Sequence, residues 1–214
     1  MKFRAVVFDF DGVLIDSEIV NVEAGARGFA AFGYSLTQED RAVILGRHSY
    51  DYTKIFQQRL GFEKLIIEPL RQKINEEYDR MFGSFIRLKP GVKEIIEFLK
   101  ARGVQLSIAT GNELKNVKIF IHKFGFEDVF DYFTTFEDVT RRKPDPEVYI
   151  IAKEKTGIPT EQTIAIEDTE IGVEAVKGAG LVCVAIPTEN TKVHNFSRAD
   201  YVFNSIQEVE KLFI

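Results

Sequence analysis

The 214-residue sequence contains a single cysteine, which excludes an intrachain disulfide. This residue, Cys183, lies in the apolar segment 181–186, where we expect it to be a small core side chain. No apolar segment approaches the roughly 20 residues that a membrane-spanning helix needs. Asp9 and Asp11 interrupt the first apolar stretch, so a secretory signal is not indicated. We therefore expect a cytoplasmic protein with no membrane partner.

The sequence also lacks an excess of basic residues. Its 28 Lys and Arg residues are outnumbered by 33 Asp and Glu residues, which gives a net charge of −5 at pH 7. Such a chain has no positive field that would gather nucleic acid or anionic lipid, so we expect no nucleic-acid partner. A phosphate-bearing ligand has to be bound locally, by a metal ion, a lysine or backbone amides. Repeats and low-complexity tracts are absent, and the composition is that of a soluble globular protein.

Strand-like and helix-like segments alternate along most of the chain. Several short, apolar segments are typical of buried parallel strands, and 132–135 is a weaker example. Between them, apolar residues recur at helical spacing, for example in 92–99 and 117–124. The alternation predicts an α/β fold with a Rossmann-like parallel sheet and helices on both faces. The main strand segments are Phe3–Phe10, Val104–Ala109, Thr163–Glu167, Leu181–Ile186 and Tyr201–Phe203, and shorter helical patterns lie at 148–152, 171–176 and 206–213.

Residues 17–86 break this alternation. They contain helical patterns and many aromatic residues but no convincing strand. A segment of about 70 residues is too long for a simple crossover connection. We therefore predict an all-helical insertion, a four-helix bundle, in an α/β domain formed by residues 1–16 and 87–214. Pro90 and Gly91 mark the return of the chain to that domain.

Acidic residues follow two of the predicted strands. Asp9 and Asp11 follow the first strand at a spacing of two, so they can point the same way, and Gly12 permits a sharp exit. Glu167 and Asp168 end the third strand. In an open parallel sheet these strand ends meet where ligands bind. Two like charges about 4 Å apart repel by ~4 kcal/mol at an effective dielectric constant near 20. We therefore predict that these four acidic residues bind a divalent cation, most naturally Mg²⁺.

Two further polar segments follow predicted strands. Thr110, Gly111 and Asn112 come after the second strand and can donate hydrogen bonds to phosphoryl oxygens. Lys143, which Pro144 is expected to hold in an extended conformation, can project a cation into the same site. Each segment alone also fits an ordinary turn or a solvated lysine. Together, three carboxylates, a divalent cation and one lysine are neutral, and such a site can admit a phosphate dianion.

These segments, in this order, resemble the motifs of the haloacid dehalogenase superfamily. The order is DFDG-V-L-x-D-S, a strand-terminal threonine, K-P-D-P and E-D-x-x-x-G. The sequence is similar to the branch with a helical cap inserted after the first strand, and the resemblance spans essentially the whole chain. That branch contains phosphoglycolate phosphatases, sugar-phosphate phosphatases and β-phosphoglucomutases. The resemblance implies a Mg²⁺-dependent phosphatase that hydrolyses a small phosphomonoester, such as a sugar phosphate or a phosphoglycolate-like compound, through an aspartyl-phosphate.

The resemblance also implies catalytic roles for four residues. Asp9 matches the nucleophile, whose carboxylate attacks phosphorus. Asp11 matches the general acid and base, which protonates the leaving oxygen and then activates water. Thr110 matches the hydroxyl that positions the phosphoryl group. Lys143 matches the cation that neutralises the nucleophile and the transferring phosphate.

Metal and substrate ligands follow from the same resemblance. Asp168 matches the metal ligand and Glu167 a direct or water-mediated second ligand, beside Asp9 and the backbone carbonyl of Asp11. The helical cap is expected to close over the site and exclude water. Its residues that face the site would then select the substrate. The expected substrate contacts are Gly12, Thr110, Gly111, Asn112 and Lys143 from the α/β domain, and Glu18, Asn21 and Arg47 from the cap.

Alternative functions within this superfamily remain open. β-Phosphoglucomutases carry a histidine twelve residues after the nucleophile, where this sequence has Asn21, and a phosphate-binding arginine that is offset from Arg47. Both differences weigh against a phosphotransferase of that type. Dehalogenases lack the second aspartate, so the presence of Asp11 weighs against a dehalogenase. Phosphonatases of this superfamily carry a Schiff-base lysine in the cap, and Lys54 and Lys64 leave that activity formally open.

His48 and the scaffold itself leave two further points open. His48, in the cap loop 45–49, is either a polar loop residue or a substrate contact. The same scaffold could also serve as a non-catalytic phospho-ligand-binding protein, although every catalytic position holds a competent residue. The expected partner is a small phosphorylated metabolite, and we expect a monomer.

Overall fold

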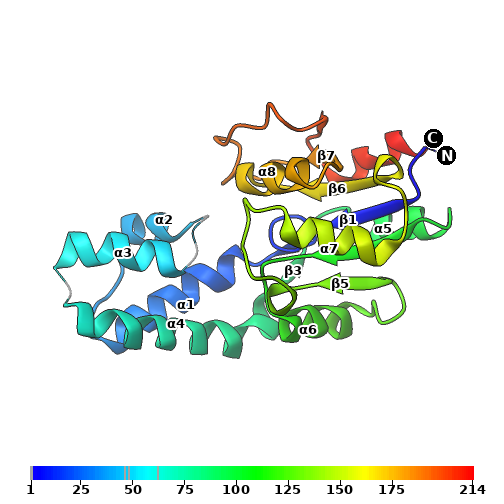
Figure 1. Cartoon of the computed structure of the whole chain (residues 1–214). Helices are drawn as coiled ribbons and strands as arrows, with labels where there is room; N and C mark the ends of the chain where they lie inside the picture. Colours follow the sequence, from blue (N-terminus) through cyan, green and yellow to red (C-terminus); the bar gives the residue numbers. More distant parts are fainter. Residues whose placement is uncertain (1, 46, 48, 62) are drawn as a thin grey trace. The chain divides into compact units, whose positions relative to one another are not determined.

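A computed structural model describes residues 2–45, 47, 49–61 and 63–214, and the chain forms two compact units (Figure 1). The first unit combines the N-terminal segment up to Asp16 with Arg87–Ile214, and the second is Ser17–Ile86. The chain therefore leaves the first unit once and returns to it once. None of the helices in the described ranges is long and apolar enough to cross a membrane.

A six-stranded parallel sheet forms the centre of the first unit, and it confirms the predicted strands. The strand order is β5-β4-β1-β6-β7-β8, so β1 lies between β4 and β6. Every residue of β1 and β6 is buried, as expected for strands covered on both faces. The strands are β1 (Ala5–Phe8), β4 (Gln105–Ala109), β5 (Tyr132–Thr134), β6 (Thr163–Glu167), β7 (Val182–Ala185) and β8 (Tyr201–Val202).

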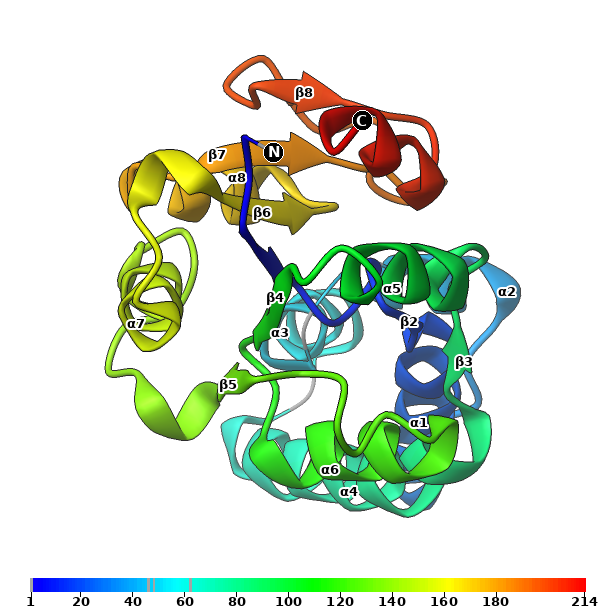
Figure 2. The same ribbon diagram turned by 90° about the vertical axis from the view of Figure 1, so that its right-hand side faces the viewer.

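Helices cover both faces of this sheet, which confirms the predicted fold class (Figure 2). One face carries α5 (Val92–Lys100), α6 (Leu114–Phe124) and the 3₁₀ helix η3 (Ile206–Leu212), and the other carries α7 (Glu147–Thr156) and α8 (Glu170–Gly178). The segment 206–213 differs from the predicted regular helix. Its buried residues Ile206 and Val209 are three positions apart, a spacing that three residues per turn bring onto one face. Two shorter 3₁₀ helices are η1 (Phe136–Asp138) and η2 (Thr160–Gln162).

Side-chain alternation decides which face each strand-end residue joins. Val7 of β1 pairs in register with Ala165 of β6, and both pack in the core cluster that includes residues of α7 and α8. Phe10 lies on the opposite side, where its ring contacts α6. Because side chains alternate along a strand, Asp9 and Glu167 continue the series of Val7 and Ala165. Both carboxylates therefore lie on the α7 and α8 side of the sheet.

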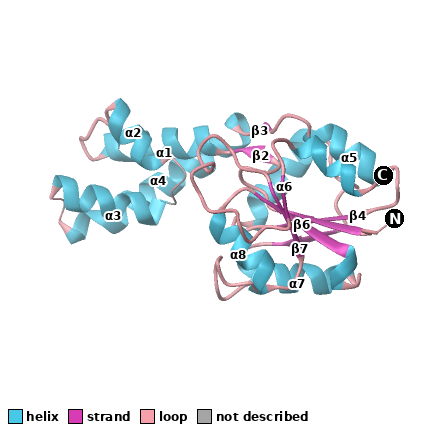
Figure 3. Cartoon of the chain, turned by 90° about the horizontal axis from the view of Figure 1, so that it is seen from above, coloured by secondary structure: helices cyan, strands magenta, loops and turns pink. Residues whose placement is uncertain are grey.

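The second unit is helical, and it has a core of its own (Figure 3). Its helices α1 and α4 pack closely because Gly28 of α1 has no side chain at the point of contact. An added Cβ there would lie 2.3 Å from Cγ1 of Ile74 in α4. The helices are α1 (Glu18–Ala31), α2 (Gln38–Ile44), α3 (Ser49–Leu60) and α4 (Lys64–Phe85). The core contains Phe29, Ile44, Tyr52, Phe56, Leu70 and Ile74.

A second, two-stranded sheet lies where the chain leaves and re-enters the first unit. Its strands β2 (Ile15–Asp16) and β3 (Arg87–Leu88) pair antiparallel. The sequence did not predict this pair, because two residues are too few to show an alternating pattern.

A capping box begins α2 in the helical unit. Asp40 N donates to the Thr37 hydroxyl (3.1 Å), and the Asp40 carboxylate accepts from Thr37 N (3.0 Å). Burial raises the pKa of this carboxyl, but the hydrogen bonds from Thr37 and the charge of Arg59 outweigh burial, so its pKa lies below the usual value. The ionised carboxylate therefore stabilises the folded chain.

Replacing Asp40 with asparagine tests this cap. A lowered pKa means that the stabilisation is complete above the unfolded-state pKa of 3.8 and is lost as the pH falls through the lower folded-state value. We expect Asp40→Asn to lower the free energy of unfolding by about 1 kcal/mol near neutral pH. The difference from wild type should shrink near pH 3. Urea denaturation at several pH values measures the free energy of unfolding of the variant and of wild type, and the exposed change Asp51→Asn is the control. A stability difference that is independent of pH would contradict the prediction.

Candidate active site

Three buried carboxylates meet at the carboxyl ends of β1 and β6. Asp9 follows β1, Glu167 is the last residue of β6, and Asp168 follows it. One oxygen from each lies within 4.8 Å of the others. Asp9 N donates to the Ile166 carbonyl (2.9 Å), which extends the ladder between the two strands past β1. The backbone ladder therefore fixes the relative positions of these carboxylates.

Lys143 bridges two of these carboxylates from the loop that precedes α7. Its Nζ lies 2.5 Å from Oδ1 of Asp9 and 2.6 Å from Oε1 of Glu167. Burial lowers the pKa of Lys143, but the charges of Asp9 and Glu167 outweigh it, so the net pKa is raised and the lysine stays protonated. The structure thus brings the predicted cation to the predicted carboxylates.

The chain around Lys143 forms a turn that the sequence did not predict. Asp145 N donates to the Arg142 carbonyl (3.0 Å), and the Lys143–Pro144 peptide bond enclosed by this turn is cis. A turn with a cis proline at its third position belongs to type VI. The conformational preference that a proline imposes on the preceding residue does not by itself indicate such a turn.

Tyr149 of α7 completes the contacts of the lysine, and the sequence did not reveal it. Its hydroxyl donates to Oε1 of Glu167 (2.6 Å) and accepts from Nζ of Lys143 (3.1 Å). Burial raises the pKa of Tyr149, and the charges of Glu167 and Asp9 raise it further, so the phenol keeps its proton. In the sequence, Tyr149 is one apolar position of a helical pattern, and this pattern carries no signal for the hydroxyl.

Glu167 accepts hydrogen bonds at both carboxylate oxygens. Oε1 accepts from Lys143 and Tyr149, as described above. Oε2 accepts from Asp168 N (3.1 Å), and from the backbone N (3.4 Å) and hydroxyl (3.2 Å) of Thr169. Glu167 therefore anchors the lysine in this structure, and its expected role as a metal ligand stays a prediction.

The buried negative charges fit a divalent cation. Burial raises the pKa of Asp9 to about 8; Lys143 opposes this shift, and the charge of Glu167 adds to it. Burial and the charges of Glu167 and Asp9 also raise the pKa of Asp168 well above its usual value. One lysine thus does not compensate the three carboxylates. A cation among their oxygens would remove the conflict, and an all-oxygen donor set suits Mg²⁺.

Two motif glycines make room for these carboxylates. Gly12 has φ +80°, and an added Cβ would lie 2.2 Å from Oδ2 of Asp168. An added Cβ at Gly172 of α8 would lie 1.9 Å from Cδ of Glu167. The glycines of the D-x-D-G and E-D-x-x-x-G motifs therefore allow close approach of backbone to carboxylate. The Gly12 amide donates to the Ile15 carbonyl (2.9 Å), so its expected contact with substrate stays a prediction.

Asp11 lies beside the segment that follows β4. Its carboxylate accepts from the side-chain amide of Asn112 (3.1 Å), and Asn112 N donates to the Thr110 hydroxyl (2.9 Å). Thr110 is buried, whereas Gly111 is exposed. The structure therefore brings Asp11 and the predicted phosphate-binding segment together. The side chain of Asp11 does not belong to the group of three carboxylates found among the described residues.

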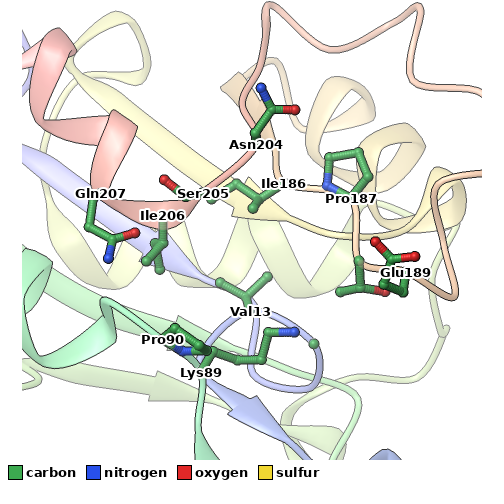
Figure 4. A pocket seen from close by; sticks show the side chains of 12 residues that line it. Val13, Lys89, Pro90, Ile186, Pro187, Glu189, Asn204, Ser205, Ile206 and Gln207 are labelled. Atoms are coloured by element: carbon green, nitrogen blue, oxygen red, sulfur yellow. The ribbon is translucent and has the colours of Figure 1, made fainter.

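A pocket of about 260 Å³ is lined in part by Gly12, the glycine that lies against the Asp168 carboxylate (Figure 4). Asp9, Lys143 and Glu167 are not among its lining residues, so the pocket and the carboxylates are neighbours and not one site. Its walls come from the loop after β1, the turn before α5, and the segments after β7 and β8. They include Val13, Lys89, Pro90, Ile186, Ser205 and Ile206.

Residues 6–186 match the family of haloacid dehalogenase-like hydrolases. The chain belongs to this family. A phosphorylated carbohydrates phosphatase of Thermotoga maritima is 32% identical over 178 residues, which cover 83% of this chain and 82% of that protein. The family match and this relative confirm that the chain is a haloacid dehalogenase-like hydrolase of the phosphatase type.

Solved structures resemble this hydrolase along nearly its whole length. CbbY from Rhodobacter sphaeroides in complex with phosphate has a TM-score of 0.80 at 28% identity, over 97% of this chain and 96% of that one. A mutant of the same CbbY in complex with xylulose-1,5-bisphosphate has a TM-score of 0.78 at 28% identity, over 95% and 94% of the two chains.

The predicted cap residues of the hydrolase lie in its helical unit. Glu18 is in the first turn of α1. The side-chain amide of Asn21 donates to the Arg47 carbonyl (2.9 Å). The Arg47 guanidinium donates to the carbonyls of Val43 in α2 and of Leu45 directly after that helix. Their contact with substrate stays a prediction. Gly46 and His48, from the same predicted loop, lie outside the described residues.

Replacing Gly172 with alanine tests the close approach of α8 to Glu167. The φ of Gly172 is not positive, so in a helix this change would ordinarily stabilise the protein by up to ~1 kcal/mol. Here the new methyl group would overlap the carboxylate of Glu167, which its donors hold in place. We expect the free energy of unfolding to fall by about 1–3 kcal/mol. Urea denaturation gives the sign directly, and a variant at least as stable as wild type would contradict the proposed contact.

Proposed function

We propose that this hydrolase is a Mg²⁺-dependent phosphatase that releases inorganic phosphate from a small phosphorylated sugar. The buried group of Asp9, Glu167 and Asp168, with Lys143 bridging the first two, carries the proposal. It combines a nucleophile, a fixed cation and room for a divalent ion at one sheet edge. The relatives support the substrate class: one is named for phosphorylated carbohydrates, and CbbY was crystallised with phosphate and with a sugar bisphosphate.

The first half of the proposed reaction transfers the phosphoryl group to Asp9. A carboxylate oxygen of Asp9 forms a bond to phosphorus, and the bond between phosphorus and the sugar oxygen breaks. Asp11 gives its proton to the departing oxygen, so the sugar leaves as a neutral alcohol. The amide of Asn112, which donates to the Asp11 carboxylate, keeps Asp11 directed at this part of the site.

The second half of the reaction restores the enzyme. A water molecule forms a bond to phosphorus and gives a proton to Asp11, which now acts as a base. The bond between phosphorus and the Asp9 oxygen breaks, and inorganic phosphate leaves. Lys143 stays protonated through both halves and compensates the charge on Asp9 and on the phosphoryl oxygens. The net reaction consumes one water and yields the sugar and phosphate.

Asp9 and Asp168 are the side chains that we propose to hold Mg²⁺, together with the backbone carbonyl of Asp11. When bound, the ion supplies positive charge to the nucleophile and to a phosphoryl oxygen. Glu167 helps to hold this arrangement in place, because its carboxylate oxygens accept hydrogen bonds from Lys143, Tyr149 and Thr169. We propose that the helical insertion serves as the cap and that Glu18, Asn21 and Arg47 contribute to substrate choice.

Replacing Asp9 with asparagine tests the chemistry. The assay measures phosphate release from a panel of sugar phosphates, phosphoglycolate and nucleotides. We expect release to depend on Mg²⁺ and to be fastest for a sugar phosphate. Asp9→Asn should lower kcat by on the order of 10³-fold or more, because no nucleophile is left. The control is Asp128→Asn, an exposed change of the same kind in the same unit.

Two outcomes of this assay would redirect the proposal. Equal release by Asp9→Asn and wild type would exclude Asp9 as the nucleophile. Absence of release, together with interconversion of hexose phosphates that requires a bisphosphate activator, would replace the phosphatase with a phosphotransferase.

Thermal unfolding tests the metal site without any substrate. A ligand that binds only the folded state at about 100 times its dissociation constant stabilises that state by about 2.7 kcal/mol. We therefore expect saturating Mg²⁺ to raise the unfolding temperature of wild type and of Asp128→Asn. Asp168→Asn should lose most of this increase, because it removes one of the buried carboxylates. An equal increase in Asp168→Asn would place the ion elsewhere.

A further inference from the structure

We propose that Tyr149 is a positioning residue of this active site: its hydroxyl group holds Lys143 and Glu167 in the arrangement that directs the lysine at Asp9. The inference rests on the proposed function for the role of Asp9 as nucleophile. The contacts of the hydroxyl group itself come from the structure alone.

The ammonium group of Lys143 is the first part of the argument. It has three N–H donors and no acceptor. Nζ lies within hydrogen-bond distance of three buried acceptors, namely Oδ1 of Asp9 (2.5 Å), Oε1 of Glu167 (2.6 Å) and the Tyr149 hydroxyl (3.1 Å). Each donor thus has one acceptor, and the three acceptors together determine both the position and the rotation of the ammonium group. Without the hydroxyl group, two acceptors remain, and the group can rotate about them.

The hydroxyl group of Tyr149 can act in only one direction. Lysine is only a donor and an ionised glutamate only an acceptor. The single phenol proton is therefore donated to Oε1 of Glu167 (2.6 Å), and the oxygen lone pairs face Lys143. Lys143, Glu167 and Tyr149 form a closed triangle of hydrogen bonds, in which each group restrains the other two.

The ring of Tyr149 is held by packing, so its hydroxyl is a fixed reference point. Tyr149 is fully buried, and it belongs to the core cluster that also contains Ala152 of α7, Ala165 of β6 and Val173 of α8. A phenylalanine would fill the same space and keep these apolar contacts. The change Tyr149→Phe therefore removes the two hydrogen bonds and little else.

Kinetics of Tyr149→Phe test the proposal. We expect kcat for the preferred phosphomonoester to fall about tenfold, which corresponds to about 1.4 kcal/mol, while KM changes by less than about twofold. If Tyr149→Phe lowers the unfolding temperature but leaves kcat per folded enzyme unchanged, Tyr149 acts on stability alone and the proposal is overturned. The matched control is Tyr52→Phe, a buried tyrosine of the helical unit whose hydroxyl has no hydrogen-bond partner among the described residues. This control should keep the wild-type kcat.

A double-mutant cycle with Glu167→Gln tests whether the hydroxyl acts through its partners. If Tyr149 works by holding Glu167 and Lys143, its removal should matter little once Glu167 has lost its charge. We expect Tyr149→Phe to lower kcat by less than about twofold in the Glu167→Gln background. A full tenfold effect in that background would overturn the proposal, because the two changes would then act independently.

A crystal structure of Tyr149→Phe separates this proposal from the proposed function. If wild type releases no phosphate from any ester, the proposed function fails, but the positioning role can still be judged from the variant. Displacement of Nζ of Lys143 from Asp9 or Glu167 in the variant supports the proposal. A lysine that still bridges both carboxylates as in wild type overturns it, whatever the activity.

Discussion

The bridge that Lys143 forms between Asp9 and Glu167 is the interaction on which the functional edge of the α/β unit depends. Parallel pairing of β1 and β6 places two buried carboxylates side by side, and Asp168 adds a third. Such a group is unstable without positive charge, and removing one partner of a buried ion pair typically costs about 3–5 kcal/mol. The lysine compensates part of this charge, and a divalent cation among the carboxylates would compensate the remainder.

The surrounding backbone is adapted to these buried charges. Gly12 and Gly172 bring the loop after β1 and the helix α8 within a distance of the carboxylates that no side chain would permit. Close approach allows backbone amides and the Thr169 hydroxyl to surround Glu167. The same buried packing that makes the unit stable therefore also orients the charged groups. Stability and the proposed catalysis therefore rest on one set of contacts, so we expect a change such as Gly172→Ala to affect both.

The two units divide the proposed work between them. The carboxylates and the lysine belong to the α/β unit, whose sheet edge fixes their positions. The helical unit has a separate core, and it carries Glu18, Asn21 and Arg47, which we propose as determinants of substrate choice. The chain crosses between the units at the short β2–β3 ribbon. If these proposals hold, the substrate contacts could vary in one unit while the catalytic residues of the other stay unchanged.

The sequence by itself determined the strands, the helical insertion and the strand-end acids, because apolar strand patterns and motif spacing are local properties of the chain. Parallel pairing then requires the ends of β1 and β6 to meet, so Asp9 and Glu167 could be predicted as neighbours. Only the tertiary structure decided what those side chains contact. Tyr149 looked like an ordinary core position, and the need for Gly172 was not evident, because each depends on how a helix packs against β6. Local sequence specifies the face and the edge of the sheet, whereas the packing of distant elements specifies the hydrogen-bond partners.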